Sequence, residues 1–152
     1  MKYPPSRYSL GPATAGLLAA LALASPSLAG DEYQAALDDV KATFGVVPQF
    51  IAQFPKVALP GAWAEMKGLL LNPDTALDPK TKALIAVGVT SAIGCKACIW
   101  MDTHEAVRAG ATEEEVREAI GIAALEQHWS IVIDGLQIDL NSLKAELGGE
   151  EE

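Results

Sequence analysis

The chain has 152 residues, and half of them are hydrophobic, which is enough apolar material for one domain with its own core. Twenty acidic residues outnumber eleven basic ones, so the formal net charge at pH 7 is −9. Because an acidic surface repels the phosphates of nucleic acids and of anionic membranes, we expect neither as a partner.

The first 29 residues predict a secretory signal peptide. Lys2 and Arg7 are basic, and residues 13–24 are almost all small or apolar. Ser27 and Ala29 hold the small positions of a cleavage site that would follow Ala29. The apolar run is too short for a comfortable membrane span. We therefore expect a periplasmic or secreted protein.

The remainder predicts an all-helical fold. Residues 30–148 are expected to form one domain of about six helices, and residues 149–152 an acidic tail. Residues 130–134 could be a strand by composition, but helical patterns on both sides favour a helix. In chain order, the predicted helical segments are 31–44, 47–54, 59–71, 79–93, 95–109, 112–129 and a continuation to about 147.

Polar residues and glycines mark the ends of these helices. Asp31 is expected to cap the first helix, and Asp78, which precedes a proline, is expected to cap the helix over 79–93. Gly94 and Gly110 are expected to end helices. Residues 112–115, with the sequence TEEE, are typical of a capping box.

Cys95 and Cys98 form a C-x-x-C pair, the strongest chemical signal in the chain. A zinc site would need more ligands, and the spacing of His104 and His128 fits no zinc-finger pattern. A disulfide that closes so small a loop stabilises a fold little. A redox dithiol is favoured because Cys95 follows Gly94 at a predicted helix start. Free N–H groups and the helix dipole stabilise a thiolate there.

Helix geometry then selects Asp102 as the partner of the two thiols. It lies four residues after Cys98 and seven after Cys95, so all three share one helix face, whereas His104 is turned away. A carboxylate would raise the pKa of a nearby thiol, so Asp102 would act as a proton acceptor rather than by charge. The alternative is an exposed acid or the partner of a nearby base.

The run from Cys95 to Glu115 contains C-x-x-C-I followed by EAVRAGATEEE, and it resembles the carboxymuconolactone decarboxylase and alkyl hydroperoxidase D superfamily. The resemblance extends over residues 77–130, and residues 44–77 resemble one branch. It implies an all-helical fold, a homo-oligomer such as a trimer or hexamer, a small peroxide or disulfide substrate, and an external thiol reductant. The decarboxylase branch lacks the cysteine pair, which argues against that activity here.

In the thiol-bearing branch, the site pairs the cysteines with a histidine four residues after the second and a glutamate twelve before the first. By resemblance, Cys98 would attack and Cys95 would resolve, whereas the helix-start argument favours Cys95 as the more acidic thiol. The histidine position holds Asp102 and the glutamate position holds Ala83. His128 corresponds to a histidine of the similar branch. It is either a functional substitute or a buried histidine at a helix kink.

These observations predict an exported thiol–disulfide oxidoreductase that reduces peroxides and needs no cofactor. One alternative is a soft-metal protein in which Asp102 or His128 joins the two cysteines around Cu(I) or Zn²⁺. Another is a non-catalytic oligomeric member, because both polar relay residues are replaced. Trp100 and Trp129 are expected in the core or against another subunit.

Overall fold

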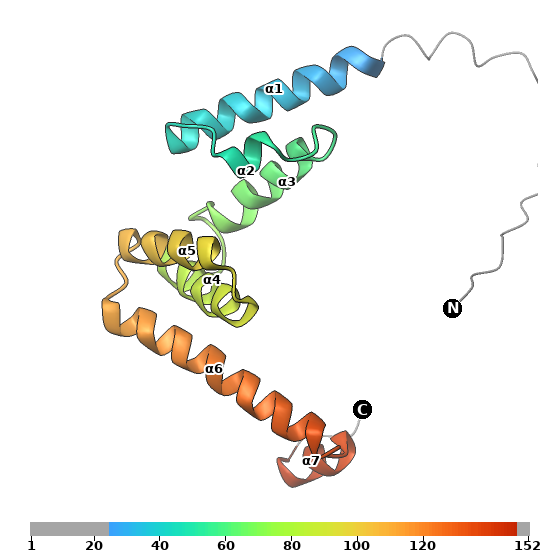
Figure 1. The fold of residues 1–152 in the computed structure, drawn as a ribbon, viewed down its shortest axis with the longest axis vertical. Helices are drawn as coiled ribbons and strands as arrows, with labels where there is room; N and C mark the ends of the chain where they lie inside the picture. The colour runs from blue at the N-terminus through green and yellow to red at the C-terminus, as the bar shows by residue number, and fades with distance from the viewer. Residues whose placement is uncertain (1–24, 149–152) are drawn as a thin grey trace, which may run out of the picture. The chain divides into compact units, whose positions relative to one another are not determined.

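The computed structural model describes residues 25–148, and every regular element in that range is a helix (Figure 1). The predicted all-helical class is confirmed. The contacts divide the chain into two compact units at Glu65 and Met66. In chain order, the elements are α1 (Ser25–Phe44), α2 (Gln49–Ala52), α3 (Leu59–Glu65), the π-helix η1 (Met66–Leu70), α4 (Pro79–Ile93), α5 (Lys96–Arg108), α6 (Glu113–Gly135) and α7 (Leu140–Glu146).

Helix α1 begins earlier than predicted. It starts at Ser25 and runs through the expected cleavage site, so Asp31 lies inside the helix and does not cap it. Pro26 is compatible with this start, because a proline in the first turn loses only an N–H that has no helical partner. Residues 1–24 of the predicted signal peptide and the predicted tail at 149–152 lie outside the described residues. No helix among those described is long and apolar enough to cross a membrane.

In the first unit, α1 and α3 pack together around Trp63, which is 5% exposed. Its Nε1 donates a hydrogen bond to Asp39 Oδ2 at 2.7 Å, and the Phe44 ring meets it edge-on at 5.6 Å. Val40 is fully buried on the same helix as Asp39. The buried Trp63 ring, whose N–H has a hydrogen-bond partner, therefore holds α1 and α3 together.

The predicted helix over 59–71 is divided in two. The α-helix ends at Glu65 and continues as the π-helix η1, where the Leu71 N–H donates to the carbonyl of Met66 at 3.1 Å. Hydrophobic spacing does not reveal such a change, because the apolar residues stay on one side. Lys82 closes the end of this segment. Its Nζ donates to the carbonyls of Leu69 at 2.7 Å and Asn72 at 2.6 Å, and its side chain is buried.

In the second unit, α5 and α6 both pack on α4. Val87 and Ala106 are fully buried where α4 meets α5. Gly88 allows α4 and α6 to approach closely, because a Cβ there would lie 3.4 Å from the carbonyl oxygen of Ala119 and 3.8 Å from the Ala123 Cβ. The buried core consists of Ala83, Val87, Ala106, Ala111 and Val116.

The helix ends in this unit follow the predicted signals. Asp78 accepts the Thr81 N–H at 3.0 Å. The Thr112 side chain accepts the Glu115 N–H at 3.1 Å, while Glu115 Oε2 accepts the Thr112 N–H at 2.7 Å, which completes the capping box. Lys80 Nζ donates to the other Glu115 oxygen at 2.7 Å. This bond, followed by the bond from Thr112, lowers the pKa of Glu115.

The C-terminal segment forms two helices with a break between them. Residues 130–134 lie inside α6, so the helical prediction for them is confirmed. Gln137 has a positive φ of 54°, and Asp139 then caps α7 by accepting the Ser142 N–H at 2.9 Å. Residues 25–148 contain more helices than the six expected. The break at 136–139 and the division after residue 65 each turn one predicted helix into two.

Candidate redox site

Cys95 begins α5 one residue after Gly94, the C-cap of α4. Gly94 has a left-handed φ of 77°, and this conformation lets the N–H groups of Gly94 and Cys95 donate to the carbonyl of Thr90 at 3.0 and 3.2 Å. Cys95 is also the N-cap of α5. The predicted helix start at this cysteine is therefore confirmed, and a single glycine separates α4 from it.

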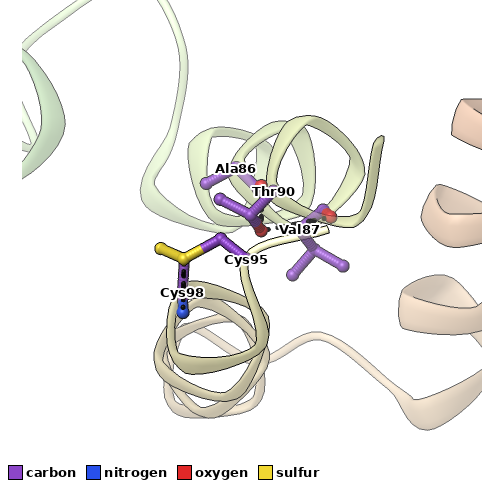
Figure 2. The surroundings of a disulfide bond; sticks show 5 residues. All are labelled: Ala86, Val87, Thr90, Cys95 and Cys98. Atoms are coloured by element: carbon purple, nitrogen blue, oxygen red, sulfur yellow. Dashed lines mark hydrogen bonds between the residues drawn. A yellow bond between two sulfur atoms is a disulfide. The ribbon is translucent and has the colours of Figure 1, made fainter. Parts of the chain in front are cut away.

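The two cysteines are joined by a disulfide, with their Cα atoms 5.3 Å apart. The Cys98 N–H donates to Cys95 Sγ at 3.3 Å, as the dashed line in Figure 2 marks. Both residues are half-buried. An N-terminal N–H group of α5 is thus aimed at a cysteine sulfur, the arrangement that stabilises a thiolate when the bond is reduced.

Helix α4 supplies the wall opposite the disulfide. Ala86, Val87 and Thr90 lie beside the two cysteines (Figure 2). The Thr90 hydroxyl donates to the carbonyls of Ala86 at 2.8 Å and Val87 at 3.4 Å. The hydrogen of the Thr90 hydroxyl is therefore used by the backbone of α4.

The position of the family glutamate is apolar in this chain. Ala83 is 5% exposed and packs in the core with Ala106. It carries no titratable group, and its burial leaves no place for a solvated acid. Ala83 therefore supplies no proton acceptor to the cysteines.

Asp102 shares a helix with Cys98. It lies on α5 one turn after Cys98 and is half-buried. Side chains four residues apart on a helix are neighbours, so the structure brings Asp102 and Cys98 to one face as the spacing predicted. Across residues 25–148, no hydrogen bond or ion pair engages its carboxylate.

The two histidines lie away from the disulfide. His104 is exposed, and its ring stacks on Trp100 with centroids 5.7 Å apart. Gln127 faces α4, because its Nε2 donates to the carbonyl of Ala92 at 2.9 Å, and His128 is turned about 100° further around α6. His128 is exposed and meets Trp129 edge-on at 5.1 Å. Figure 2 shows the disulfide on the side of the α4–α5 pair away from α6. The structure therefore does not bring His128 to the cysteines, and the His128 side chain is exposed rather than buried.

The two tryptophans expected in the core or against another subunit are not in the core of the chain, since Trp100 is 69% and Trp129 51% exposed. Helical spacing alone does not distinguish an exposed tryptophan from one in the core.

A groove between α4 and α6 is lined mainly by aliphatic side chains such as Leu84, Ile85 and Ile122, and neither cysteine lines it. Among residues 25–148, no group of three His, Cys, Asp or Glu side chains gathers in a geometry that could hold a metal ion.

Comparison with known proteins assigns the family. The profile of the carboxymuconolactone decarboxylase family matches residues 58–138, which is more than half of the chain. The chain belongs to this family. Its matched region contains α4, α5, both cysteines and all of α6.

Two known proteins are similar to this member of the family. The crystal structure of the alkylhydroperoxidase AhpD core from Rhodospirillum rubrum superposes with a TM-score of 0.63 at 25% identity, covering 82% of this chain and 95% of that one. Uncharacterized protein 4 in the cox locus of Paracoccus denitrificans is 49% identical over 51 residues, which are 34% of this chain. The match spans 46% of the length of that protein. The helical fold is therefore of the AhpD-like type.

Sequence reasoning missed Thr90 beside the disulfide and a buried lysine elsewhere on α4. Thr90 lies seven residues after Ala83 and so shares its helix face, but a lone threonine in an apolar helix gave no reason to single it out. Lys82 is buried, which is rare for lysine, and only its hydrogen bonds to the end of η1 explain that position.

Proposed function

We propose that this protein is a thiol–disulfide oxidoreductase that cycles Cys95 and Cys98 between dithiol and disulfide, with peroxides among its substrates. One observation carries the proposal: the disulfide lies at the N-terminus of α5, where the Cys98 N–H is directed at Cys95 Sγ. Membership of the carboxymuconolactone decarboxylase family and the AhpD-like fold support a redox enzyme.

The N-cap position favours a thiolate at Cys95. Its sulfur already accepts one backbone N–H in the oxidised form, and the dipole of the thirteen-residue helix α5 adds to this attraction. Thiols at helix N-termini can have pKa values of about 3.5–7.5, well below the usual 8.5. A thiol whose pKa lies below about 7 is more than half ionised at neutral pH, and the thiolate is the form that attacks.

A peroxide would be reduced at the cysteine pair in two steps, formation of a sulfenic acid and closure of the disulfide. A thiolate attacks the outer peroxide oxygen, the O–O bond breaks, and a sulfenic acid and an alkoxide form. The alkoxide takes a proton and leaves as an alcohol. The second thiolate then attacks the sulfenic sulfur, releasing water after protonation and closing the disulfide. An external thiol reductant returns two electrons and two protons by exchange through a mixed disulfide.

We propose Asp102 as the proton acceptor of this cycle. It lies one helical turn from Cys98, and its carboxylate has no competing partner in residues 25–148. It would take the thiol proton and pass it to the leaving alkoxide, the task that the family histidine at this position would perform. His128 contributes no support to this step, since it is exposed on another helix.

The proposal includes export and self-association. Basic residues followed by an apolar run and small residues before position 30 support a periplasmic or secreted location, where disulfides persist. Large apolar side chains exposed along α6 and α7 support association of identical subunits into the trimer or hexamer that the resemblance implies.

Single-cysteine variants test the proposal. Cys95→Ser and Cys98→Ser should each abolish turnover in peroxide and insulin-disulfide assays, because neither can close the disulfide. Full activity in Cys98→Ser would refute a dithiol cycle. The pKa of the thiol that remains in each variant identifies the attacking residue, which is the more acidic one.

The reduction potential of the Cys95–Cys98 disulfide distinguishes a catalytic cysteine pair from a structural one. We expect a value between about −270 and −120 mV, the range of known dithiol catalysts. A value below about −300 mV, with neither thiol acidified, would mean a structural disulfide and would favour a non-catalytic member of the family. Metal analysis of untagged protein tests the soft-metal alternative, which no described cluster favours.

A further inference from the structure

The groove between α4 and α6, hereafter the α4–α6 groove, presents aliphatic side chains to solvent. Ile85 and Val89 line it from α4 and Ile122 lines it from α6, and each of the three is at least half exposed. Its volume is about 870 Å³, which is enough for several large side chains. All of its lining residues lie within positions 81–130, so α7 of the same chain does not fill it. An exposed apolar surface of this kind indicates a contact with another molecule.

Two carboxylates lie along the α6 side of this groove. Glu118 and Glu126 both line it. Within residues 25–148, neither carboxylate takes part in a hydrogen bond or an ion pair. Glu115, the third acid of the lining, is already bound by Lys80. An occupant that carries both apolar side chains and a positive charge would therefore complement the groove.

The last part of the chain, residues 128–147, forms an arm that runs past the end of α4. Gln127 bonds to the carbonyl of Ala92 near that end, and α6 continues from there to Gly135, a further length of about 12 Å. Helix α7 follows at the end of α6 (Figure 1), and it packs substantially on no other helix of residues 25–148. A helix of seven residues is marginal in water unless it packs on something. The arm therefore lacks, within the described part of its own chain, the surface that would stabilise it.

The arm carries the side chains that the groove would accept. Leu140, Leu143 and Leu147 follow each other at three- and four-residue spacing and so form one stripe, in which Leu140 is 62% and Leu147 78% exposed. Lys144 borders this leucine stripe, four residues after Leu140. Its ammonium forms no hydrogen bond or ion pair with any residue that the structure describes. The stripe thus matches the aliphatic lining of the groove, and Lys144 matches its two carboxylates.

We propose that the arm of one copy of this chain docks in the α4–α6 groove of a second copy, with the leucine stripe on the aliphatic lining and Lys144 near the two carboxylates. The arm and the groove are different surfaces, so the contact is head-to-tail. Head-to-tail contacts close into rings when the rotation permits, as a trimer requires. The inference rests on the self-association that the proposed function includes, and it goes beyond it by naming the two surfaces that meet.

Cross-linking of mixed assemblies tests this contact in the full chain. Val89→Cys and Leu140→Cys are co-expressed with a tag on one of them. The purified protein is then treated with a short bismaleimide while the Cys95–Cys98 disulfide stays oxidised. We expect a covalent dimer that contains both variants, because Val89 lines the groove and Leu140 lies on the arm. The tag separates this product from cross-links between identical variants.

Val107→Cys is the matched control for Val89→Cys. Val107 is 52% exposed, as against 51% for Val89, but it lies on α5 and does not line the groove. Co-expressed with Leu140→Cys, it should give no mixed product. A mixed product of Val89→Cys with Val107→Cys, without one of Val89→Cys with Leu140→Cys, would make α5 of the neighbouring copy the occupant and would overturn the proposal.

Charge reversal on the arm tests the same contact without a cross-linker. Lys144→Glu would place a further acid beside Glu118 and Glu126, so we expect the association of subunits to weaken about tenfold. Sedimentation over a series of concentrations measures this change. Lys96→Glu reverses an exposed lysine outside the groove and the arm, and it should leave the association unchanged.

The outcomes distinguish this inference from the proposed function. Absence of the mixed cross-link, or unchanged association in Lys144→Glu, would overturn docking of the arm in the groove while self-association and the redox cycle stand. A wild-type chain that stays monomeric at every concentration would overturn docking and self-association together. The redox activity of Cys95 and Cys98 is tested separately by the single-cysteine variants, since neither cysteine lines the groove.

Discussion

Gly94→Ala, in the turn before the disulfide, should lower the stability of the protein. Gly121→Ala, inside a helix of the same unit, should raise it. Gly94 has a φ of 77°, and Gly121 lies inside α6. A Cβ added at either position would meet no atom within 4 Å, so steric overlap does not enter the comparison. The difference between the two substitutions reports backbone conformation alone.

At Gly94, the left-handed conformation costs an alanine about 1–2 kcal/mol. The lower entropy of the unfolded alanine chain returns about 0.4–1 kcal/mol of that. Gly94→Ala should therefore lower the free energy of unfolding by about 1 kcal/mol. Gly121→Ala should raise it by about 0.5–1 kcal/mol, because alanine is the better helix former. Gly94→Asn should cost less than Gly94→Ala, since asparagine tolerates this conformation.

Urea unfolding followed by far-ultraviolet circular dichroism measures these differences, with the disulfide oxidised in every variant. A Gly94→Ala protein as stable as the wild type would refute the argument. So would a change of the same sign in both alanine variants, because the turn would then not require the left-handed conformation.

Three further results are expected. Trp63→Phe should lower the free energy of unfolding by about 1.5 kcal/mol, because it removes the 2.7 Å bond to the partly buried Asp39 carboxylate, whereas Trp129→Phe, which is exposed, should change little. Glu115→Gln should destabilise the protein at pH 7. Since Lys80 lowers the folded-state pKa of Glu115 below its unfolded value, the contribution is complete above the unfolded pKa and disappears as pH falls through the folded one. The two proteins should thus converge in acid, and a gap that persists there would contradict the assignment. Light scattering of the purified protein should give the mass of a trimer or hexamer, and a monomer would refute self-association.

Local signals predicted the structure well where one residue type decides the backbone. Gly94 ended α4, Thr112 and Glu115 formed the capping box, and Cys95 began α5. Each of these outcomes depends on hydrogen bonds to residues within a few positions in the chain. The spacing of Asp102 from Cys98 also translated directly into a shared helix face.

Features that depend on distant residues were not predictable in this way. Asp31 is a good capping residue, but the preceding segment continues the helix and removes the need for a cap. The replacement of a relay glutamate by Ala83 could be seen in the sequence, yet its packing against Ala106 could not. The placement of His128 required knowing which face of α6 meets α4, and the bond from Gln127 to Ala92 supplied that.

The joint between α4 and α5 is held mainly by bonds between residues close to it in sequence. Thr90 receives the N–H groups that close α4, Cys95 caps α5, and the disulfide ends at Cys98, so all of these bonds lie within nine residues of sequence. One bond reaches this joint from outside the two helices, from Gln127 Nε2 of α6 to the carbonyl of Ala92. Because most of these bonds are local, the turn over residues 90–98 could be grafted between another pair of packed helices to introduce a dithiol at a chosen helix end.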